Sequence, residues 1–134
     1  MINWLEEASR LIEQGKGFEV KVEDEEVKVD EAKPSKVKLP VKGVKKYAGR
    51  RGLSREMKNL LLKVVEGLGS SKVPFKVTIG GGEFIVRFDL DRYVRVHGEG
   101  ASVVGFRSLD EHPVSTIAGL LREHGEVKLL SLVR

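Results

Sequence analysis

Apolar residues recur along the chain with two different periods, and each change of period marks a new element. Helical spacing appears in three segments, which begin at Asn3, at Ser54 and at Pro113. The middle segment has the most continuous apolar stripe, so we expect it to be the main core helix, closed by Gly67 and Gly69. Its stripe consists of Leu53, Met57, Leu60, Leu61, Val64, Val65 and Leu68.

Alternation with a period of two predicts strands in the remaining segments. The expected strands cover residues 18–23, 27–30, 75–79, 84–88, 93–97, 103–107 and 127–133. In the strand at 103–107, the alternation predicts that Val104 and Phe106 point inward and that Val103 points outward. The last strand is apolar on both sides at Leu129 and Leu130, so we expect it to be central in a sheet or to lie in an interface.

These elements predict an α+β fold with a mostly antiparallel sheet. The sheet consists of a four-stranded meander plus a C-terminal strand and is packed by two helices, with an N-terminal helix and β-hairpin docked on it. We expect residues 1–134 to form one compact domain. Two sub-units at 1–44 and 53–134, joined by a basic linker at 45–52, are the alternative. A unit of about 44 residues is small for independent folding.

Composition narrows the class of protein. The chain has no cysteine, which excludes disulfides and thiolate chemistry, and it has no apolar run long enough to cross a membrane. We therefore expect a cytoplasmic protein with no membrane partner. Charged residues make up 33% of the chain and amide side chains are scarce, a profile typical of thermophile and archaeal proteins.

Charge is strongly segregated along the sequence. Residues 1–31 carry ten acids and four bases, residues 32–51 carry eight bases and no acid, and residues 52–134 carry twelve bases and ten acids. Such asymmetry indicates a localised surface for an anionic partner. Within this basic stretch, the predicted nucleic-acid-binding residues are Lys36, Lys38, Lys42, Lys45, Lys46, Tyr47, Arg50 and Arg51.

The meander predicts a second part of the same site. If the alternation holds, one sheet face carries Arg87, Tyr93 and Arg95, together with Lys76, Thr78, His97 and Arg107. Cations neutralise phosphates and aromatic rings stack on bases, so such a face suits single-stranded DNA or RNA. The competing interpretation is a solvated face whose cations pair with Asp89, Glu83 and Glu99 across the strands.

Two further segments could suggest nucleotide or metal binding. Gly80-Gly81-Gly82 has neither P-loop nor dinucleotide-binding spacing, so we expect a hairpin turn there. Asp89 and Asp91 would share a face in an extended strand and could hold Mg²⁺, but arginines flank them. We predict no catalytic site, metal or cofactor, and therefore a non-catalytic binding protein.

Two alternatives concern protein partners. The basic segment could order against an acidic protein, which would make the chain an adaptor or a small subunit of a larger complex. Trp4, Leu62, Leu90 and the last strand are more apolar material than a small monomer needs, so a homodimer joined through helix or edge-strand contacts is a further hypothesis, with ordinary core filling as its alternative.

Overall fold

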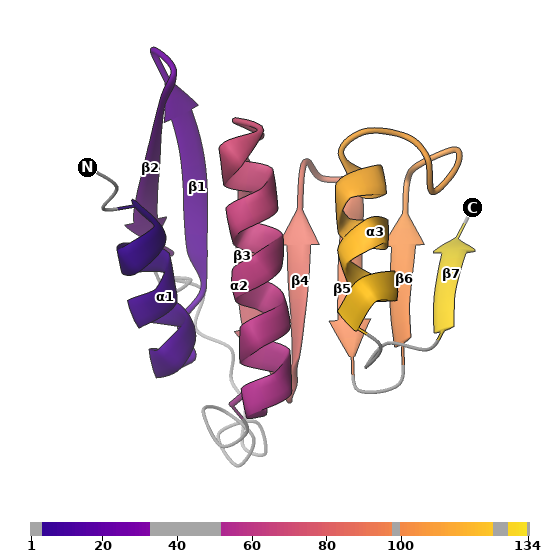
Figure 1. Cartoon of the computed structure of the whole chain (residues 1–134), viewed down its shortest axis with the longest axis horizontal. Helices are drawn as coiled ribbons and strands as arrows, with labels where there is room; N and C mark the ends of the chain where they lie inside the picture. Colours follow the sequence, from indigo (N-terminus) through magenta and orange to yellow (C-terminus); the bar gives the residue numbers. More distant parts are fainter. Residues whose placement is uncertain (1–3, 33–51, 98–99, 125–128, 134) are drawn as a thin grey trace, which may run out of the picture.

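The computed structural model describes residues 4–32, 52–97, 100–124 and 129–133. The chain forms three helices and seven strands in these ranges (Figure 1). In order they are α1 (Trp4–Gln14), β1 (Phe18–Glu23), β2 (Glu26–Glu31), α2 (Arg55–Ser70), β3 (Phe75–Gly80), β4 (Glu83–Arg87), β5 (Tyr93–His97), β6 (Gly100–Val104), α3 (Val114–His124) and β7 (Leu129–Val133).

The strands form one sheet in the order β2-β1-β3-β4-β5-β6-β7. Every neighbouring pair is antiparallel except β6 and β7, which are parallel and are connected through α3. The predicted α+β class, the meander and the N-terminal helix and hairpin are confirmed. The hairpin extends the sheet itself, because β1 pairs with β3 from Phe18 to Val20.

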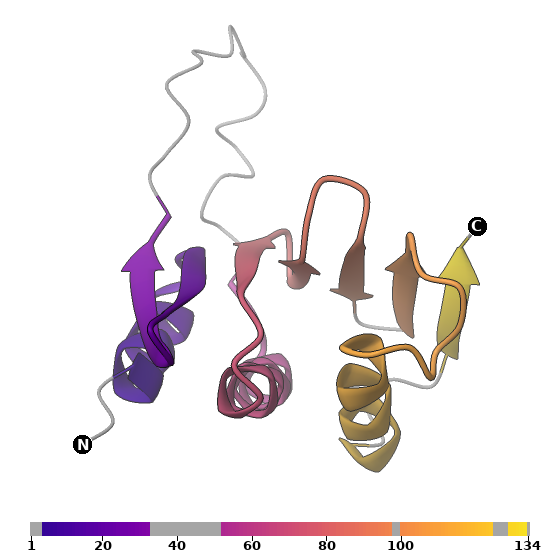
Figure 2. The ribbon, with the colours of Figure 1, turned by 90° about the horizontal axis from the view of Figure 1, so that it is seen from above.

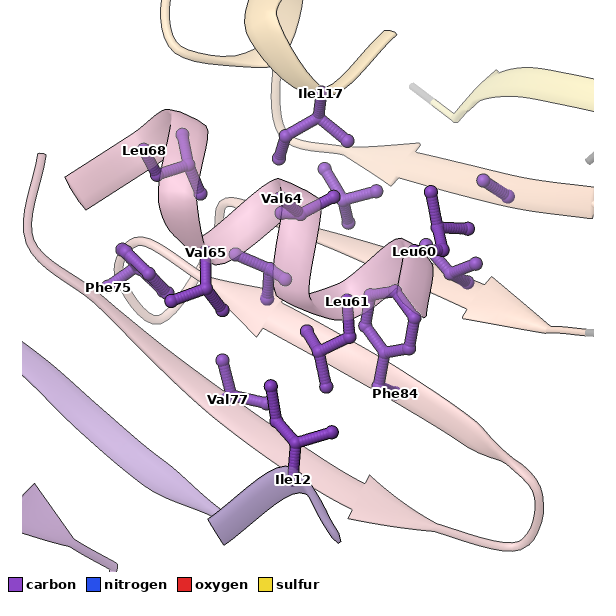
Figure 3. Packing of buried hydrophobic residues seen from close by; sticks show 14 of the residues in the cluster. Ile12, Leu60, Leu61, Val64, Val65, Leu68, Phe75, Val77, Phe84 and Ile117 are labelled. Carbon is purple, nitrogen blue, oxygen red and sulfur yellow. The ribbon is translucent and has the colours of Figure 1, made fainter. Parts of the chain in front are cut away.

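All three helices lie on one side of the sheet (Figure 2). The strand residues that face them are buried, as Val77, Val86 and Val94 illustrate. These side chains pack with apolar side chains of the helices in one hydrophobic cluster (Figure 3). We call the helix side of the sheet the covered face and the opposite side the open face, since no described helix lies over the latter.

Local signals in the sequence explain where the helices begin and end. Ser54 caps α2, because its Oγ accepts a hydrogen bond from the backbone N–H of Met57 at 3.2 Å. Gly15, at a φ of 72°, ends α1, and the N–H of Lys16 donates to the carbonyl oxygen of Leu11 at 2.9 Å. A left-handed residue after the last turn permits this bond, and glycine adopts that conformation without steric cost.

The prediction that Gly67 and Gly69 close α2 is wrong, because the helix continues through both to Ser70. Their role is close packing. A methyl group added at Gly69 would overlap the ring of Trp4, and one added at Gly67 would lie 3.2 Å from Cγ2 of Thr116 in α3. The two glycines therefore allow α1 and α3 to approach α2, which holds the three helices in one layer.

The prediction that Val104 points inward and Val103 outward in β6 is wrong. Val103 is buried with 1% exposure, whereas Val104 is half-exposed. Phe106 is buried at 4% exposure as predicted, but it follows Gly105, whose φ of 88° interrupts the alternation. The kink at Gly105 returns the chain to the core three residues after Val103, which a strict period of two cannot anticipate.

The prediction of a central position for the last strand is also wrong. β7 is the last strand of the sheet within the described residues, and only β6 pairs with it. The crossover through α3 places β7 parallel to β6 at the edge, where Leu132 still packs against the core.

Candidate nucleic-acid interface

The sheet register brings the three predicted sheet residues together on the open face. Arg87 of β4 lies directly between Lys76 of β3 and Tyr93 of β5, and Arg95 lies opposite Ile85 in the next row. Each alternates with a buried residue of the covered face. Among the residues that the structure describes, no helix therefore covers Arg87, Tyr93 or Arg95.

Arg87 is held in place by its neighbours. Its guanidinium lies 4.5 Å from the centre of the Tyr93 ring, and its Nη1 donates to the carbonyl oxygen of Leu90 at 2.9 Å. The stacking is a cation–π contact that uses one face of the ring. The result is a preorganised cation beside an aromatic ring.

Lys76 and Arg87 carry like charges at directly opposite positions of two strands. Neither forms an ion pair with a carboxylate of the described residues, whereas most of the other described cations do. Like charges that face each other across strands are unfavourable. On its other side Lys76 lies opposite Glu19 of β1, which offsets part of this repulsion. Arg87 has Lys76 on one side and the Tyr93 ring on the other, so no carboxylate of the described strands lies directly opposite it.

Arg95 is differently placed, because Glu83 already neutralises it. Arg95 Nε lies 2.7 Å from Oε1 of Glu83 and Nη2 lies 3.0 Å from Oε2, which is a bidentate pair. The hydrogen bonds that Arg95 donates to this carboxylate raise the pKa of Arg95. For this residue the competing interpretation, pairing across strands, describes the structure.

A groove of about 610 Å³ lies beside Lys76 and Arg87. β1 and β3 pair over only three positions, and the next residue, Pro74, has no N–H to continue the ladder. The groove is lined by Glu19, Val20, Lys21, Val22, Glu23, Pro74, Phe75, Lys76, Arg87, Phe88, Asp89 and Leu90. Leu90 is 86% exposed at its rim.

The sequence did not predict this groove or its cation Lys21, although one signal was present. Pro74, directly before a predicted strand, indicates where a ladder must stop. The lining carries three cations and three carboxylates, so the groove has mixed charge. Its positive part is the side formed by Lys76 and Arg87, next to Tyr93.

Asp89 is engaged in the turn between β4 and β5. Its Oδ1 accepts the N–H of Asp91 at 3.0 Å and its Oδ2 accepts Nε of Arg92 at 2.7 Å. These bonds, that from Arg92 above all, lower the pKa of Asp89. Among the residues that the structure describes, no three His, Asp or Glu side chains are arranged to hold a metal ion.

The glycine-rich segment is a hairpin turn, as predicted. Gly80 pairs with Glu83, and Gly81 and Gly82 between them have φ values of 63° and 79°. Two consecutive left-handed residues are typical of a type I′ turn, which glycine favours.

The remaining predicted contacts lie outside the described residues. They are Lys36, Lys38, Lys42, Lys45, Lys46, Tyr47, Arg50 and Arg51, which all belong to the basic segment at 33–51. Only their sequence bears on the site. The segment is connected to Ala32 after β2 and to Gly52 before α2.

No protein-family model, curated protein or solved structure matches the chain. In the described parts, none of the helices combines the length and the apolar character needed to span a membrane. The open face and the distribution of charge are therefore the grounds for assigning a function.

Proposed function

We propose that the protein binds single-stranded nucleic acid, without catalysis, through its open sheet face and the basic segment at 33–51. One observation carries the proposal: Lys76 and Arg87 lie side by side on the open face, next to Tyr93. Cations that contact phosphates beside an aromatic ring that stacks on a base form a general arrangement for binding single strands.

The distribution of charge assigns different roles to the two parts. The described residues contain eighteen acids and fourteen bases, a balance of −4, whereas residues 33–51 contain eight bases and no acid. Most phosphate neutralisation would thus come from the basic segment. The open face would add two cations and a ring that position the strand.

The first turn of α2 offers little for reading duplex DNA. The cations in the first turn of α2 are already paired, since Arg55 Nη2 and Lys58 Nζ each lie 3.2 Å from Oε1 of Glu13. A recognition helix instead presents free Arg, Asn or Gln side chains to the major groove. This favours single strands, and the backbone phosphates and bases are common to RNA and DNA.

A protein–protein adaptor is the second candidate, favoured by the mixed charge of the groove. Lys21, Lys76 and Arg87 line it together with Glu19, Glu23 and Asp89. An extended peptide of mixed charge would match this lining, and Leu90 at the rim could contact an apolar side chain. The basic segment would then contact an acidic part of the same partner.

Fluorescence anisotropy of labelled single-stranded RNA, single-stranded DNA and duplex DNA, titrated across a salt series, tests the proposal. We expect single strands to bind more tightly than duplex. The affinity should fall with salt by about 0.7 log units per log unit for each phosphate contacted. Flat titrations for all three ligands at low salt would contradict nucleic-acid binding, and pull-downs would then test the adaptor.

Two variants separate the parts of the site. Replacing Lys45, Lys46, Arg50 and Arg51 by Ala should lower both the affinity and the salt slope. Lys76→Ala with Arg87→Ala should weaken binding several-fold more than the matched control, Lys63→Ala with Arg122→Ala, which removes two exposed cations from the helices. Equal losses in the two double variants would mean that only net charge matters.

A further inference from the structure

The two edges of the sheet differ in how they are protected from pairing with another chain. β2 carries Glu26, Lys28, Asp30 and Glu31, all exposed, whereas the sequence of β7 from Leu129 to Val133 contains no charged residue. Charged side chains on an edge strand oppose pairing with another strand, and an apolar edge strand invites it. Within the described residues, the β7 edge has no such guard.

We infer that this edge pairs with the β7 edge of a second copy of the chain. Antiparallel pairing about a two-fold axis perpendicular to the sheet gives a closed dimer with one continuous sheet. When the five residues of each strand overlap fully, Ser131 lies opposite the partner's Ser131, and residue 129 lies opposite residue 133. No charged residue of β7 then faces another.

The distribution of charge favours β7–β7 pairing over β2–β2 or β2–β7 pairing. Residues 18–31 hold seven acids and two bases, and their hairpin forms the opposite edge of the sheet (Figure 1). Pairing through β7 puts the two acidic hairpins at the far ends of the joined sheet, where their repulsion is smallest. Pairing β2 with β2 would bring them together, and pairing β2 with β7 would leave an edge open for endless addition.

Apolar surface continues from the edge strand onto the open face. Val133 is 43% exposed and lies at a hollow of about 580 Å³, which is otherwise lined by Val104, Gly105, Phe106 and Arg107. A second strand along β7 would reduce the exposure of this hollow on each copy. Two five-residue strands still form a small interface, below about 1,200 Å², so we expect a dissociation constant in the micromolar range or weaker.

The symmetry also places the two open faces on the same side. A perpendicular two-fold axis keeps both helix layers on one side of the joined sheet, so the Arg87–Tyr93 rows of both copies face the same solvent region. Dimerisation is inferred from the edge strands alone and does not depend on whether the open face binds nucleic acid.

Sedimentation equilibrium of nuclease-treated protein over a wide concentration range tests the inference. The mass should rise from that of the 14.9 kDa chain toward twice that value and no further. Ser131→Asp and Ser131→Lys each place like charges opposite each other across the two-fold axis, so each should weaken the dimer about five-fold. An equal mixture of the two variants should restore the affinity, because opposite charges then face each other.

Thr78→Asp and Thr78→Lys are the matched controls, since Thr78 is exposed on the same face in the interior of the sheet. They should leave dimerisation unchanged. The inference is overturned by a monomer at every concentration, by Ser131 variants that dimerise as strongly as these controls, by a mixture no tighter than either variant alone, or by assemblies that grow beyond two copies.

Discussion

The covered and open faces of the sheet share one backbone but hold different kinds of side chain. On β3 and β4, Val77 and Val86 are buried against the helices, while their neighbours Lys76 and Arg87 point to solvent. Burial of a large apolar side chain contributes about 1.5–3 kcal/mol, whereas exposed charges contribute little to stability. Stability therefore depends on one face, and the side chains of the other face can be replaced at little cost to the fold.

The largest effect should come from emptying the covered face. Phe84 is fully buried in the core beneath α2, so Phe84→Ala should lower the free energy of unfolding by about 3–5 kcal/mol. Ile85→Ala, one residue along on the open face and only half-buried, should cost less than half as much. Urea denaturation of both variants measures this, and comparable losses would contradict the division between the faces.

The next largest loss of stability should come from disturbing the packing of the helices over the covered face. Gly69→Ala should destabilise the protein by about 1–3 kcal/mol, because the added methyl group meets the Trp4 ring. Gly119→Ala in α3 is the matched control: a methyl group there meets no atom within 4 Å, so the helix should gain about 1 kcal/mol. Thermal unfolding distinguishes the two, and a gain for both would contradict the role of Gly69 in helix packing.

Periodicity in the sequence predicted the elements and their inward residues where the alternation is unbroken, as in β3 and α2. It could not predict the phase of β6 or the edge position of β7. The phase of β6 depends on the backbone conformation at Gly105. The edge position of β7 depends on which side of β6 the chain reaches after α3. Both are decided by tertiary contacts, which local patterns do not contain.

The site was predictable to a similar extent. Alternation correctly placed Arg87, Tyr93 and Arg95 on one face, but it could not tell a free cation from a paired one. Glu83 is twelve residues from Arg95 and reaches it only through the register of β4 and β5. The turns on either side of β4 set that register, so the pairing becomes visible only once the strands are aligned.

The smallest effect should come from Asp89, an exposed carboxylate at the end of the groove. Arg92 lowers the pKa of Asp89, so the charged carboxylate stabilises the folded state at any pH above the ordinary value of about 3.9. This stabilisation is lost as the pH falls through the lower pKa of the folded state. Asp89→Asn should therefore be slightly less stable than the parent at neutral pH.

The two proteins should converge as the pH falls below the lowered pKa of folded Asp89, because the protonated carboxyl is then as uncharged as the amide of the variant. Urea denaturation of both at pH 7, 5 and 2.5 measures the difference directly. A gap that stays constant or widens in acid would mean that Asp89 does not stabilise the folded state through its charge. A gap at neutral pH as large as that of Phe84→Ala would mean that the open face contributes as much to stability as the covered face does.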